Sequence, residues 1–555
     1  MDGKSRYLET RDGRARRAVW VALAVILAAQ AAVLLYFAYL RQGFHVDELL
    51  TFFLANNSAS AAPYPKDQPD YVGQWHDAQY FRDFLTCQPS EVFRFGFVYE
   101  NQKADVLGPL YFLLLHLACS FAPDGFSKWI VVAAHLLLFL LCGVLLWQMG
   151  RRLLKSDWAA LLPVILWGFS AGAASSTLYF RVYPLLMLFL VLITFLAFRV
   201  AESPRVRWPL AAAVALTVAG GFLTHYYFVL YTLFLGLALG VFLLLRRRFA
   251  DLGRSLLAVG AGAGLGVLIF PFSMDQAFTS YRGRGAWEQI ASGGPRWGET
   301  LAAYGAALRD QLFGGTAVLV AVAVVLAAGG VFLLCRRLRR PRGRLPGDTG
   351  CRAAKLLMLG AAVAGYTLTV AVVAPYSAAR YVYPVFPLVL FAVAALLWLL
   401  LQTLWRSRRA RAVCFAAVCL FALCIGSLGL GRQQVENLLP AELKSTYTST
   451  VDPEGGAAKN AGAYCMVVYP EQFVDFTYFL YPEFFHYQKI CLLHDDQTDR
   501  LAALAADIPR DTPVVVYVKL TKPAEEQVKE LGAALGRTEA EHLFDSRVFA
   551  VYRFT

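Results

Sequence analysis

The chain contains a series of long apolar runs, and these constrain its fold more than any other feature. The first extends from Ala18 to Leu40 and as a helix would span roughly 35 Å. Others lie near residues 129–150, 157–173, 182–200, 208–223, 225–245, 254–272, 313–335, 354–374, 382–404 and 412–430. Several exceed the length of about 18 residues at which an apolar helix crosses the hydrocarbon core of a bilayer. The sequence therefore predicts an all-α polytopic membrane protein with about eleven transmembrane helices.

Composition and the start of the chain agree with this class. Charged residues make up 16% of the sequence and hydrophobic residues 58%, whereas soluble domains carry about 25% charged residues. The first apolar run follows the basic segment RDGRARR, as a signal peptide would. It is much longer than the apolar region of about 7–15 residues in a secretory signal, so an uncleaved anchor is the better interpretation.

A shorter run at 107–122, VLGPLYFLLLHLACSF, decides the topology. If it crossed the membrane, RRLLK (151–155) and RRRF (246–249) would emerge outside, against the positive-inside rule. We therefore expect a short helix that lies on, or dips into, the outer face. The N-terminus is then cytoplasmic, the C-terminus is extracytoplasmic, and the protein is a multi-pass protein of the plasma membrane.

The distribution of charge supports this arrangement. The predicted inner segments hold 28 Lys and Arg against 7 Asp and Glu, and the rest of the chain holds 24 against 32. These inner segments are 1–17, 151–157, 199–207, 246–254, 336–355 and 406–411. The net charge of +13 is thus mainly an orientation signal, and nucleic acid is not an expected partner.

Two domains are expected. Residues 1–431 form the transmembrane domain, which includes an external loop at 41–128 with surface-lying helices. Residues 432–555 form a small extracytoplasmic α/β domain, because strand-like runs (YCMVVY, KICLL, TPVVVYVK, RVFAVYRF) alternate with helix-like ones (TDRLAALAADI, PAEEQVKELGAAL). This tail has no glycine-rich phosphate loop and no metal motif, so an accessory role is expected. Cys465 and Cys491 could form a disulfide.

With this topology, polar residues near the membrane gather on the outer side. They are His45, Asp47, Glu48, Asp105, Arg181, Tyr183, His225, Tyr226, Arg380 and Tyr381. Each one alone has a structural interpretation: a solvated carboxylate, an arginine that snorkels to lipid phosphate, or an interfacial tyrosine. Ionisable residues at membrane depth are nonetheless costly and mark functional sites by default. Their combination on one face favours a site at the outer leaflet.

These residue types suit transfer from a phosphorylated lipid. A carboxylate such as Asp47 can take the proton of an attacking hydroxyl. Arg181 and Arg380 can stabilise the departing phosphate. A second carboxylate, Glu48, could orient the first or hold a divalent metal ion, for which Asp105 and His225 are further candidate ligands.

The motifs VDELLT, DVLGPLYFLLLH, FRVYPLL and ARYVYPVFP resemble those of the GT-C superfamily of membrane glycosyltransferases. The resemblance spans roughly residues 1–400 and is to family-39-like bacterial enzymes, which are similar to protein O-mannosyltransferases and the aminoarabinose transferase of lipid A. It implies a polyprenyl-phosphate sugar donor, transfer on the non-cytoplasmic face, and inversion at the anomeric carbon.

The same resemblance implies roles for individual residues. Asp47 corresponds to the acidic residue proposed as the general base, and Glu48 to its partner. Arg181 and Arg380 match positions near the donor phosphate, and we place Tyr183, His225, Tyr226, Tyr381 and Asp105 among the substrate-binding candidates. Where the family often has Asp-x-His-Pro-Pro-Leu-Tyr, this chain has Leu107 and Gly108 in place of the histidine and the first proline. This departure counts against a ligating histidine there.

Two other classes of function stay open from sequence. A transporter or flippase for a lipid-linked substrate is the main alternative, although the duplicated halves common in transporters are not visible. A non-catalytic scaffold that displays the tail is the other. Membrane lipids are expected partners, and the acceptor could be a protein, a lipid or a wall polymer.

Overall fold

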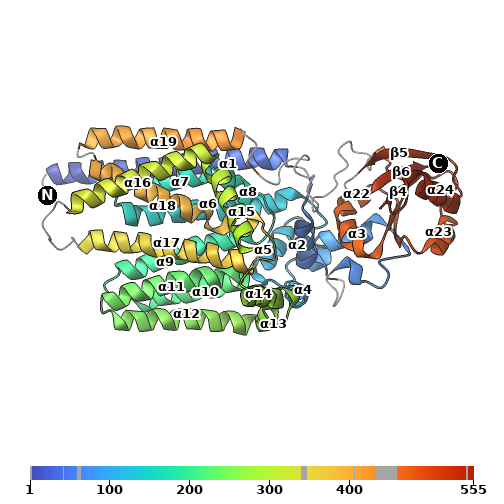
Figure 1. Ribbon diagram of the computed structural model, residues 1–555, viewed down its shortest axis with the longest axis horizontal. Coiled ribbons are helices and arrows are strands. Elements are labelled where there is room, and N and C mark those ends of the chain that lie inside the picture. Colours follow the sequence, from blue (N-terminus) through green and yellow to red (C-terminus); the bar gives the residue numbers. More distant parts are fainter. Residues whose placement is uncertain are drawn as a thin grey trace. The chain divides into compact units, whose positions relative to one another are not determined.

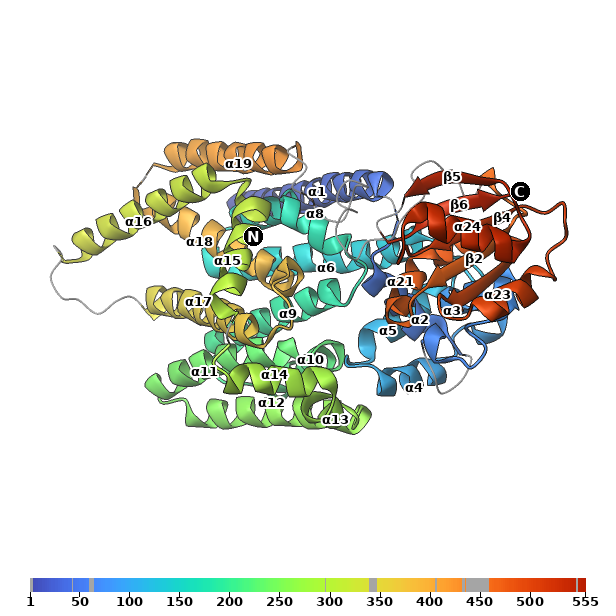
Figure 2. The same ribbon diagram turned by 45° about the vertical axis from the view of Figure 1, so that its right-hand side comes forward.

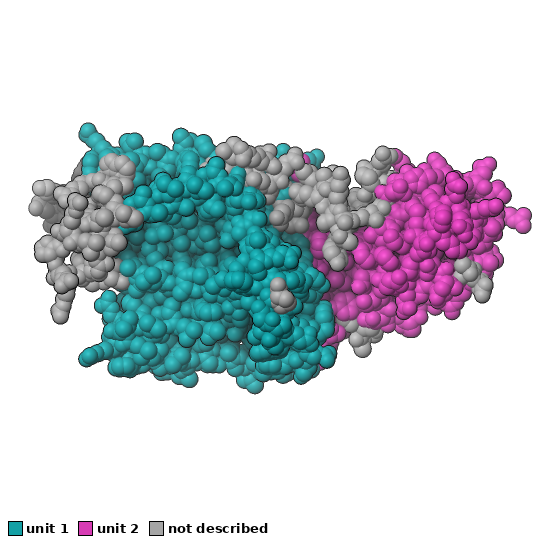
Figure 3. Space-filling model, in the orientation of Figure 1, with its two compact units in different colours: residues 1–39, 106–111, 132–436 teal, residues 40–105, 112–131, 437–555 magenta. Residues whose placement is uncertain are grey.

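The structure is a computed structural model that describes residues 3–41, 43–58, 64–294, 296–338, 347–404, 407–431, 435, 459–545 and 548–555. The chain divides into two compact units (Figure 3). Unit 1 comprises residues 1–39, 106–111 and 132–436, and unit 2 comprises residues 40–105, 112–131 and 437–555. The units therefore group the external loop with the tail. Residues 432–434 and 436–458, at the start of the predicted tail domain, lie outside the described residues.

Unit 1 is built from helices (Figure 1). They are α1 (Gly3–Leu40), α6 (Lys128–Leu154), α7 (Leu161–Gly168), α8 (Ala171–Thr177), α9 (Tyr183–Glu202), α10 (Trp208–Thr224), α11 (Tyr227–Leu245), α12 (Phe249–Ile269), α13 (Ser273–Phe278), α14 (Tyr281–Ala291), α15 (Trp297–Ala307), η3 (Leu308–Leu312), α16 (Thr316–Leu338), α17 (Gly347–Val373), η4 (Ala379–Tyr381), η5 (Tyr383–Val385), α18 (Phe386–Leu404) and α19 (Arg408–Gly431).

The chain is a multi-pass membrane protein. Among the described residues, seven helical segments are long and apolar enough to cross a bilayer: Arg17–Leu40, Lys128–Leu154, Tyr183–Glu202, Tyr227–Leu245, Phe249–Ile269, Cys351–Val373 and Tyr383–Gln402. An eighth candidate is the pair Trp297–Leu312 and Thr316–Gly330, which is bent by 89° at a short break. The predicted fold class is confirmed, whereas the predicted count of about eleven crossings is not.

Local interruptions explain part of this difference. The run at 157–173 contains Ser170, whose hydroxyl donates to the Trp167 carbonyl and accepts the Ala173 amide. Ser170 thereby ends α7 and caps α8, so this run forms two short helices. The run at 208–223 forms α10, which has only 17 residues and ends at His225 in an extended conformation (φ −162°).

The helices of unit 1 pack as membrane helices do. Figure 1 shows α10, α11 and α12 side by side, and α17 packs along α11. At Gly262 of α12, an added Cβ would come within 2.3 Å of the Ala215 carbonyl oxygen of α10, so the absence of a side chain allows the backbones to approach closely. On α12, Leu257 and Leu268 are exposed, as expected for a helix that faces lipid.

Unit 2 combines helices with one sheet. Its elements are α2 (Val46–Asn56), η1 (Pro65–Asp67), β1 (Trp75–His76), α3 (Ala78–Leu85), η2 (Pro89–Glu91), α4 (Gly96–Ala104), most of α5 (Leu110–Cys119), β2 (Tyr464–Tyr469), η7 (Glu471–Phe473), α21 (Val474–Thr477), η8 (Tyr478–Leu480), α22 (Tyr481–Phe484), β3 (Lys489–His494), α23 (Thr498–Ala505), β4 (Val514–Val518), α24 (Ala524–Leu535), β5 (Ala540–Asp545) and β6 (Ala550–Phe554). Helix α5 has 10 residues and at about 15 Å is too short to cross a bilayer.

The sheet confirms the predicted small α/β fold of the tail. Its strand order is β1-β3-β2-β4-β6-β5, in which β2, β3 and β4 are parallel and β6 is antiparallel to β4. Two strands were not predicted: β5 at one edge, and β1, which comes from the external loop and pairs with β3. Helices α23 and α24 pack on one face of the sheet (Figure 2). The core beneath them includes Met466, Cys491 and Leu531.

The sheet register also settles the suggested disulfide. Cys465 pairs with Ile490, and Cys491 pairs with Met466. Because successive residues of a strand point to opposite faces, the two cysteines lie on different sides of the sheet. Both are buried free thiols, and a bond between them would require a change of register.

Candidate functional site

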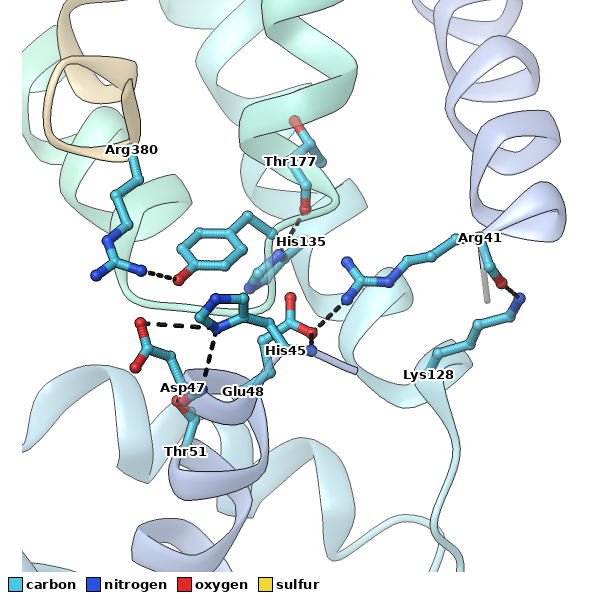
Figure 4. Close-up of polar contacts among 10 residues, drawn as sticks. Arg41, His45, Asp47, Glu48, Thr51, Lys128, His135, Thr177 and Arg380 are labelled. Atoms are coloured by element: carbon cyan, nitrogen blue, oxygen red, sulfur yellow. Dashed lines mark hydrogen bonds and ion pairs between the residues drawn. The ribbon is translucent and has the colours of Figure 1, made fainter. Parts of the chain in front are cut away.

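The acidic pair Asp47-Glu48 opens helix α2 of unit 2. His45 is the N-cap residue, and Glu48 stands three residues later, so the two form a capping box. The Glu48 carboxylate accepts the His45 amide at 2.8 Å, and the Asp47 amide donates to Nδ1 of His45 at 3.1 Å. The sequence HVDE therefore begins a helix whose first turn fixes both carboxylates (Figure 4).

Glu48 is held in a buried ion pair. Its side chain is fully buried and contacts the guanidinium of Arg41, of which only 2% is exposed. The Arg41 carbonyl in turn accepts the Lys128 ammonium group (Figure 4). A carboxylate enclosed in this way orients the turn that carries Asp47, which favours a positioning role for Glu48 over direct chemistry.

Asp47 is the accessible member of the pair. A quarter of its side chain is exposed, and its carboxylate lies 3.7 Å from Nδ1 of His45. The same nitrogen accepts the Asp47 amide. Of the two carboxylates, only that of Asp47 is exposed to solvent.

Asp105 also belongs to unit 2. It follows α4 as the C-cap residue, and its carboxylate accepts the hydroxyl of Tyr64 at 3.1 Å. Within the described residues, no group of three or more His, Cys, Asp or Glu side chains is arranged to hold a metal ion. Within those residues, neither Glu48 and Asp105 of unit 2 nor His225 of unit 1 belongs to such a group.

Unit 1 contains a cluster of arginines and aromatic rings, here called the arginine–tyrosine cluster, which consists of Tyr179, Arg181, Tyr183, His225, Tyr227, Arg380 and Tyr381. Arg380 donates to the Tyr179 hydroxyl at 2.8 Å (Figure 4) and lies 5.4 Å from the centre of the Tyr381 ring.

Ring contacts complete this cluster. Tyr183 lies 6.1 Å from His225 and 6.3 Å from Tyr381, and Tyr227 lies 5.8 Å from Tyr381. Residues from the start of α9, the α10–α11 corner and η4 thus meet in one place. Five predicted candidates are members: Arg181, Tyr183, His225, Arg380 and Tyr381.

The cluster contains Tyr227 instead of the predicted Tyr226. The hydroxyl of Tyr226 donates to Gln276 of α13, and its ring packs on Phe222, outside the cluster. Its neighbour Tyr227 takes the place in the cluster, 4.6 Å from the His225 ring. Successive residues at the start of a helix point in different directions, and the sequence alone does not give the phase of α11.

His225 is a neutral hydrogen-bond donor in this setting. Burial, and secondarily the charge of Arg181, lower the pKa of His225 to about 3. Its Nδ1 accepts the Tyr227 amide at 3.1 Å, so the ring proton lies on Nε2. His225 can therefore donate one hydrogen bond but does not supply a positive charge for a phosphate at neutral pH.

The GPLYF motif is fixed by its neighbours in unit 1. Tyr111 bonds Nε2 of His135 at 2.8 Å, and Nδ1 of His135 bonds the Thr177 carbonyl at 2.7 Å (Figure 4). At Gly108, an added Cβ would lie 2.2 Å from the Leu223 carbonyl oxygen. Glycine at this position therefore lets the motif pack directly against the end of α10, two residues before His225.

Part of the chain matches the model of a known protein family. Residues 107–274 match the family model described as dolichyl-phosphate-mannose-protein mannosyltransferase. This match contains the GPLYF and FRVYPLL motifs and confirms the resemblance to family-39-like GT-C glycosyltransferases.

The chain is also similar to solved structures. The chain is similar to the crystal structure of ArnT from Cupriavidus metallidurans bound to undecaprenyl phosphate, with 12% identity, a TM-score of 0.49, and coverage of 96% of this chain and 98% of that chain. It is also similar to the crystal structure of the same protein in the apo state, with 11% identity, a TM-score of 0.41, and coverage of 91% of this chain and 96% of that chain. A comparison with curated protein sequences finds no match.

Proposed function

We propose that the protein is an inverting membrane glycosyltransferase that moves a sugar from a polyprenyl-phosphate donor to an acceptor hydroxyl. The observation that carries this proposal is the family match over residues 107–274, because that segment includes Arg181, Tyr183 and His225. The arginine–tyrosine cluster adds support, since guanidinium groups bind phosphate and aromatic rings pack on sugars.

The proposed reaction is a single displacement. The Asp47 carboxylate removes the proton of the acceptor hydroxyl while the hydroxyl oxygen attacks the anomeric carbon. The bond from that carbon to the phosphate oxygen breaks, and polyprenyl phosphate leaves with the electron pair. Arg181 and Arg380 stabilise the negative charge of the leaving group. Attack from the side opposite the phosphate inverts the configuration.

Purified protein in lipid nanodiscs tests the proposal with a panel of polyprenyl-phosphate sugars and acceptor molecules. We expect wild type to release polyprenyl phosphate only when an acceptor is present, and Asp47→Asn to bind donor without releasing it. Asp475→Asn is a matched control, because Asp475 is 62% exposed and forms a surface pair with Lys66, which contributes little to stability. Equal turnover by wild type and Asp47→Asn would remove Asp47 as the base.

Two further results separate this proposal from the alternatives. Movement of a lipid-linked substrate across sealed vesicles without bond cleavage would identify a transporter or flippase instead. The predicted sidedness places the tail outside and the N-terminus in the cytoplasm. Protease added to intact cells should therefore cleave a C-terminal tag and leave an N-terminal tag intact, and the opposite pattern would reject transfer on the outer face.

A further inference from the structure

Helix α15 of unit 1 brings a tyrosine that the motif analysis did not single out, Tyr304, to the arginine–tyrosine cluster. Thr300 and Tyr304 lie on one buried face of α15, and Tyr304 is fully buried. The Thr300 hydroxyl bonds Ser377 at 2.8 Å, and Arg296 donates to the Pro375 carbonyl at 3.0 Å. These contacts fix α15 to the segment that leads into η4, where Arg380 and Tyr381 lie.

The surroundings of the Tyr304 phenol belong to the same cluster. Helix α15 packs against η4 and α17, and the phenol interacts electrostatically with Tyr381, Tyr183 and Arg380. The chain continues from α15 into the π-helical turn Leu308–Leu312 and then bends by 89° into α16. Such π-turns and broken helices at membrane depth are common where a helix lines a binding site.

The Tyr304 hydroxyl is distinguished by what it does not contact. Among the described residues, no backbone or side-chain group hydrogen-bonds it. Two other buried tyrosines nearby in the fold are satisfied: Tyr366 donates to the Tyr381 carbonyl at 2.8 Å, and Tyr231 bonds Thr194 at 2.7 Å. Buried polar groups in proteins are almost always paired, and an unpaired one destabilises the fold. Within the described part of the chain, the Tyr304 hydroxyl is therefore available to a partner that is not a protein group.

We propose that the Tyr304 hydroxyl donates a hydrogen bond to a phosphate oxygen of the lipid-linked donor, which makes it a further binding residue of the site. This inference rests on the proposed function. An anionic oxygen is the acceptor that fits, because the neighbouring Arg380 attracts anions and a phenol is a good donor to a charged group.

The test compares Tyr304→Phe with Tyr231→Phe, both in full-length protein in nanodiscs. Each change removes one buried phenolic oxygen. Binding of undecaprenyl phosphate, which carries no sugar, is measured by titration, and thermal unfolding is measured without ligand. For Tyr304→Phe we expect affinity to fall about tenfold or more, the typical effect of a hydrogen bond to a charged group. Its unfolding midpoint should stay the same or rise, because no protein hydrogen bond is lost.

Tyr231→Phe should show the reverse pattern, with a lower unfolding midpoint and unchanged affinity, since its partner is Thr194. Unchanged affinity of Tyr304→Phe, or a clear loss of its stability without ligand, would overturn the inference while leaving the proposed function in place. If Tyr304→Phe bound undecaprenyl phosphate normally but bound the sugar-bearing donor weakly, the phosphate assignment would be wrong. If wild type bound no polyprenyl phosphate at all, the proposed function and this inference would both fall.

Discussion

Replacing Glu48 with glutamine should cost the protein stability rather than remove a catalytic group. The Glu48 carboxylate is fully buried, and its partner Arg41 is 2% exposed. Glutamine retains an oxygen that can accept the His45 amide, so the capping hydrogen bond can persist. The charge is lost, however, and the buried Arg41 guanidinium no longer faces the carboxylate that it contacts in the wild type. Breaking a buried ion pair from one side typically costs about 3–5 kcal/mol, and we expect a loss of this size in Glu48→Gln.

The loss should be local to the turn that carries Asp47. Hydrogen exchange of the amides in Val46–Asn56 measures it, because exchange rates report the free energy of local opening. Asp47→Asn is the matched control: Asp47 is a quarter exposed, so protection should stay near that of wild type although transfer is lost. Arg41→Met combined with Glu48→Gln removes both charges. This double variant should recover most of the lost stability, since both charges of the buried ion pair are removed together.

Two results would contradict the structural role of Glu48. If Glu48→Gln kept wild-type protection in α2 and yet abolished transfer at saturating donor, Glu48 would act in the chemistry, as its motif position suggests. If the double variant were as unstable as the sum of the single changes, Arg41 and Glu48 would contribute independently and the buried pair would not be the cause.

Three other perturbations follow from the structure. Because burial lowers the pKa of His225 to about 3 from 6.5, the unfolded chain binds a proton that the folded chain does not. Stability should therefore fall by up to about 1.4 kcal/mol per pH unit as the pH drops below 6.5, and an undiminished slope in His225→Gln would contradict this assignment. Gly108→Ala should lower the free energy of unfolding by about 1–3 kcal/mol through overpacking, and the unfolding midpoint should fall with it. Gly236→Ala is the control and should leave the midpoint unchanged, because an added Cβ there meets nothing within 4 Å. Equal midpoints of the two variants would show that the Leu223 carbonyl moves to accommodate the extra methyl group. The segment 459–555 expressed alone should lack a cooperative unfolding transition, because β1 lies in the external loop, and a sharp transition would show that the tail folds by itself.

The parts of the fold that the sequence predicted are those with a local signal. Long apolar runs predicted helices such as α6 and α9, and alternating or continuous β-branched runs predicted β2 and β4 within a residue or two. The break between α7 and α8 has a weaker signal, because the sequence shows only a single serine within an apolar run. The role of Ser170 becomes clear from its hydrogen bonds to both helices in the structure. Strand β1 has two residues and exists through its pairing with β3, so no local pattern indicates it.

The candidate site divides in the same way. Asp47 and Arg380 stand out because charged residues beside apolar runs are rare and costly. Tyr304 has no such signal, because a tyrosine within an apolar helix is usually part of the core. Among the described residues the hydroxyls of Tyr469 and Tyr478 in unit 2 also lack a hydrogen-bond partner, and Tyr304 differs from them because it lies at the arginine–tyrosine cluster. The structural role of Glu48 has only a partial signal in HVDE, since a glutamate three positions after the N-cap belongs to the capping box, but histidine is not among the usual N-cap residues. The buried pairing with Arg41 strengthens that interpretation but depends on tertiary packing.

Within unit 2 the tail packs directly against the external loop and against helix α2. The ring of Phe53, on the helix that Asp47 opens, packs 5.2 Å from Tyr478 and 5.3 Å from Tyr481 of the tail. Tyr71 of the external loop bonds the Thr477 hydroxyl at 2.6 Å. A change in the tail therefore reaches the helix of the proposed base through direct side-chain packing. An exchange of the whole tail that altered the acceptor range would not by itself locate acceptor binding there, because the same exchange removes the support of α2. Substitutions confined to exposed tail residues, with α2 protection measured alongside, separate acceptor recognition from support of the base.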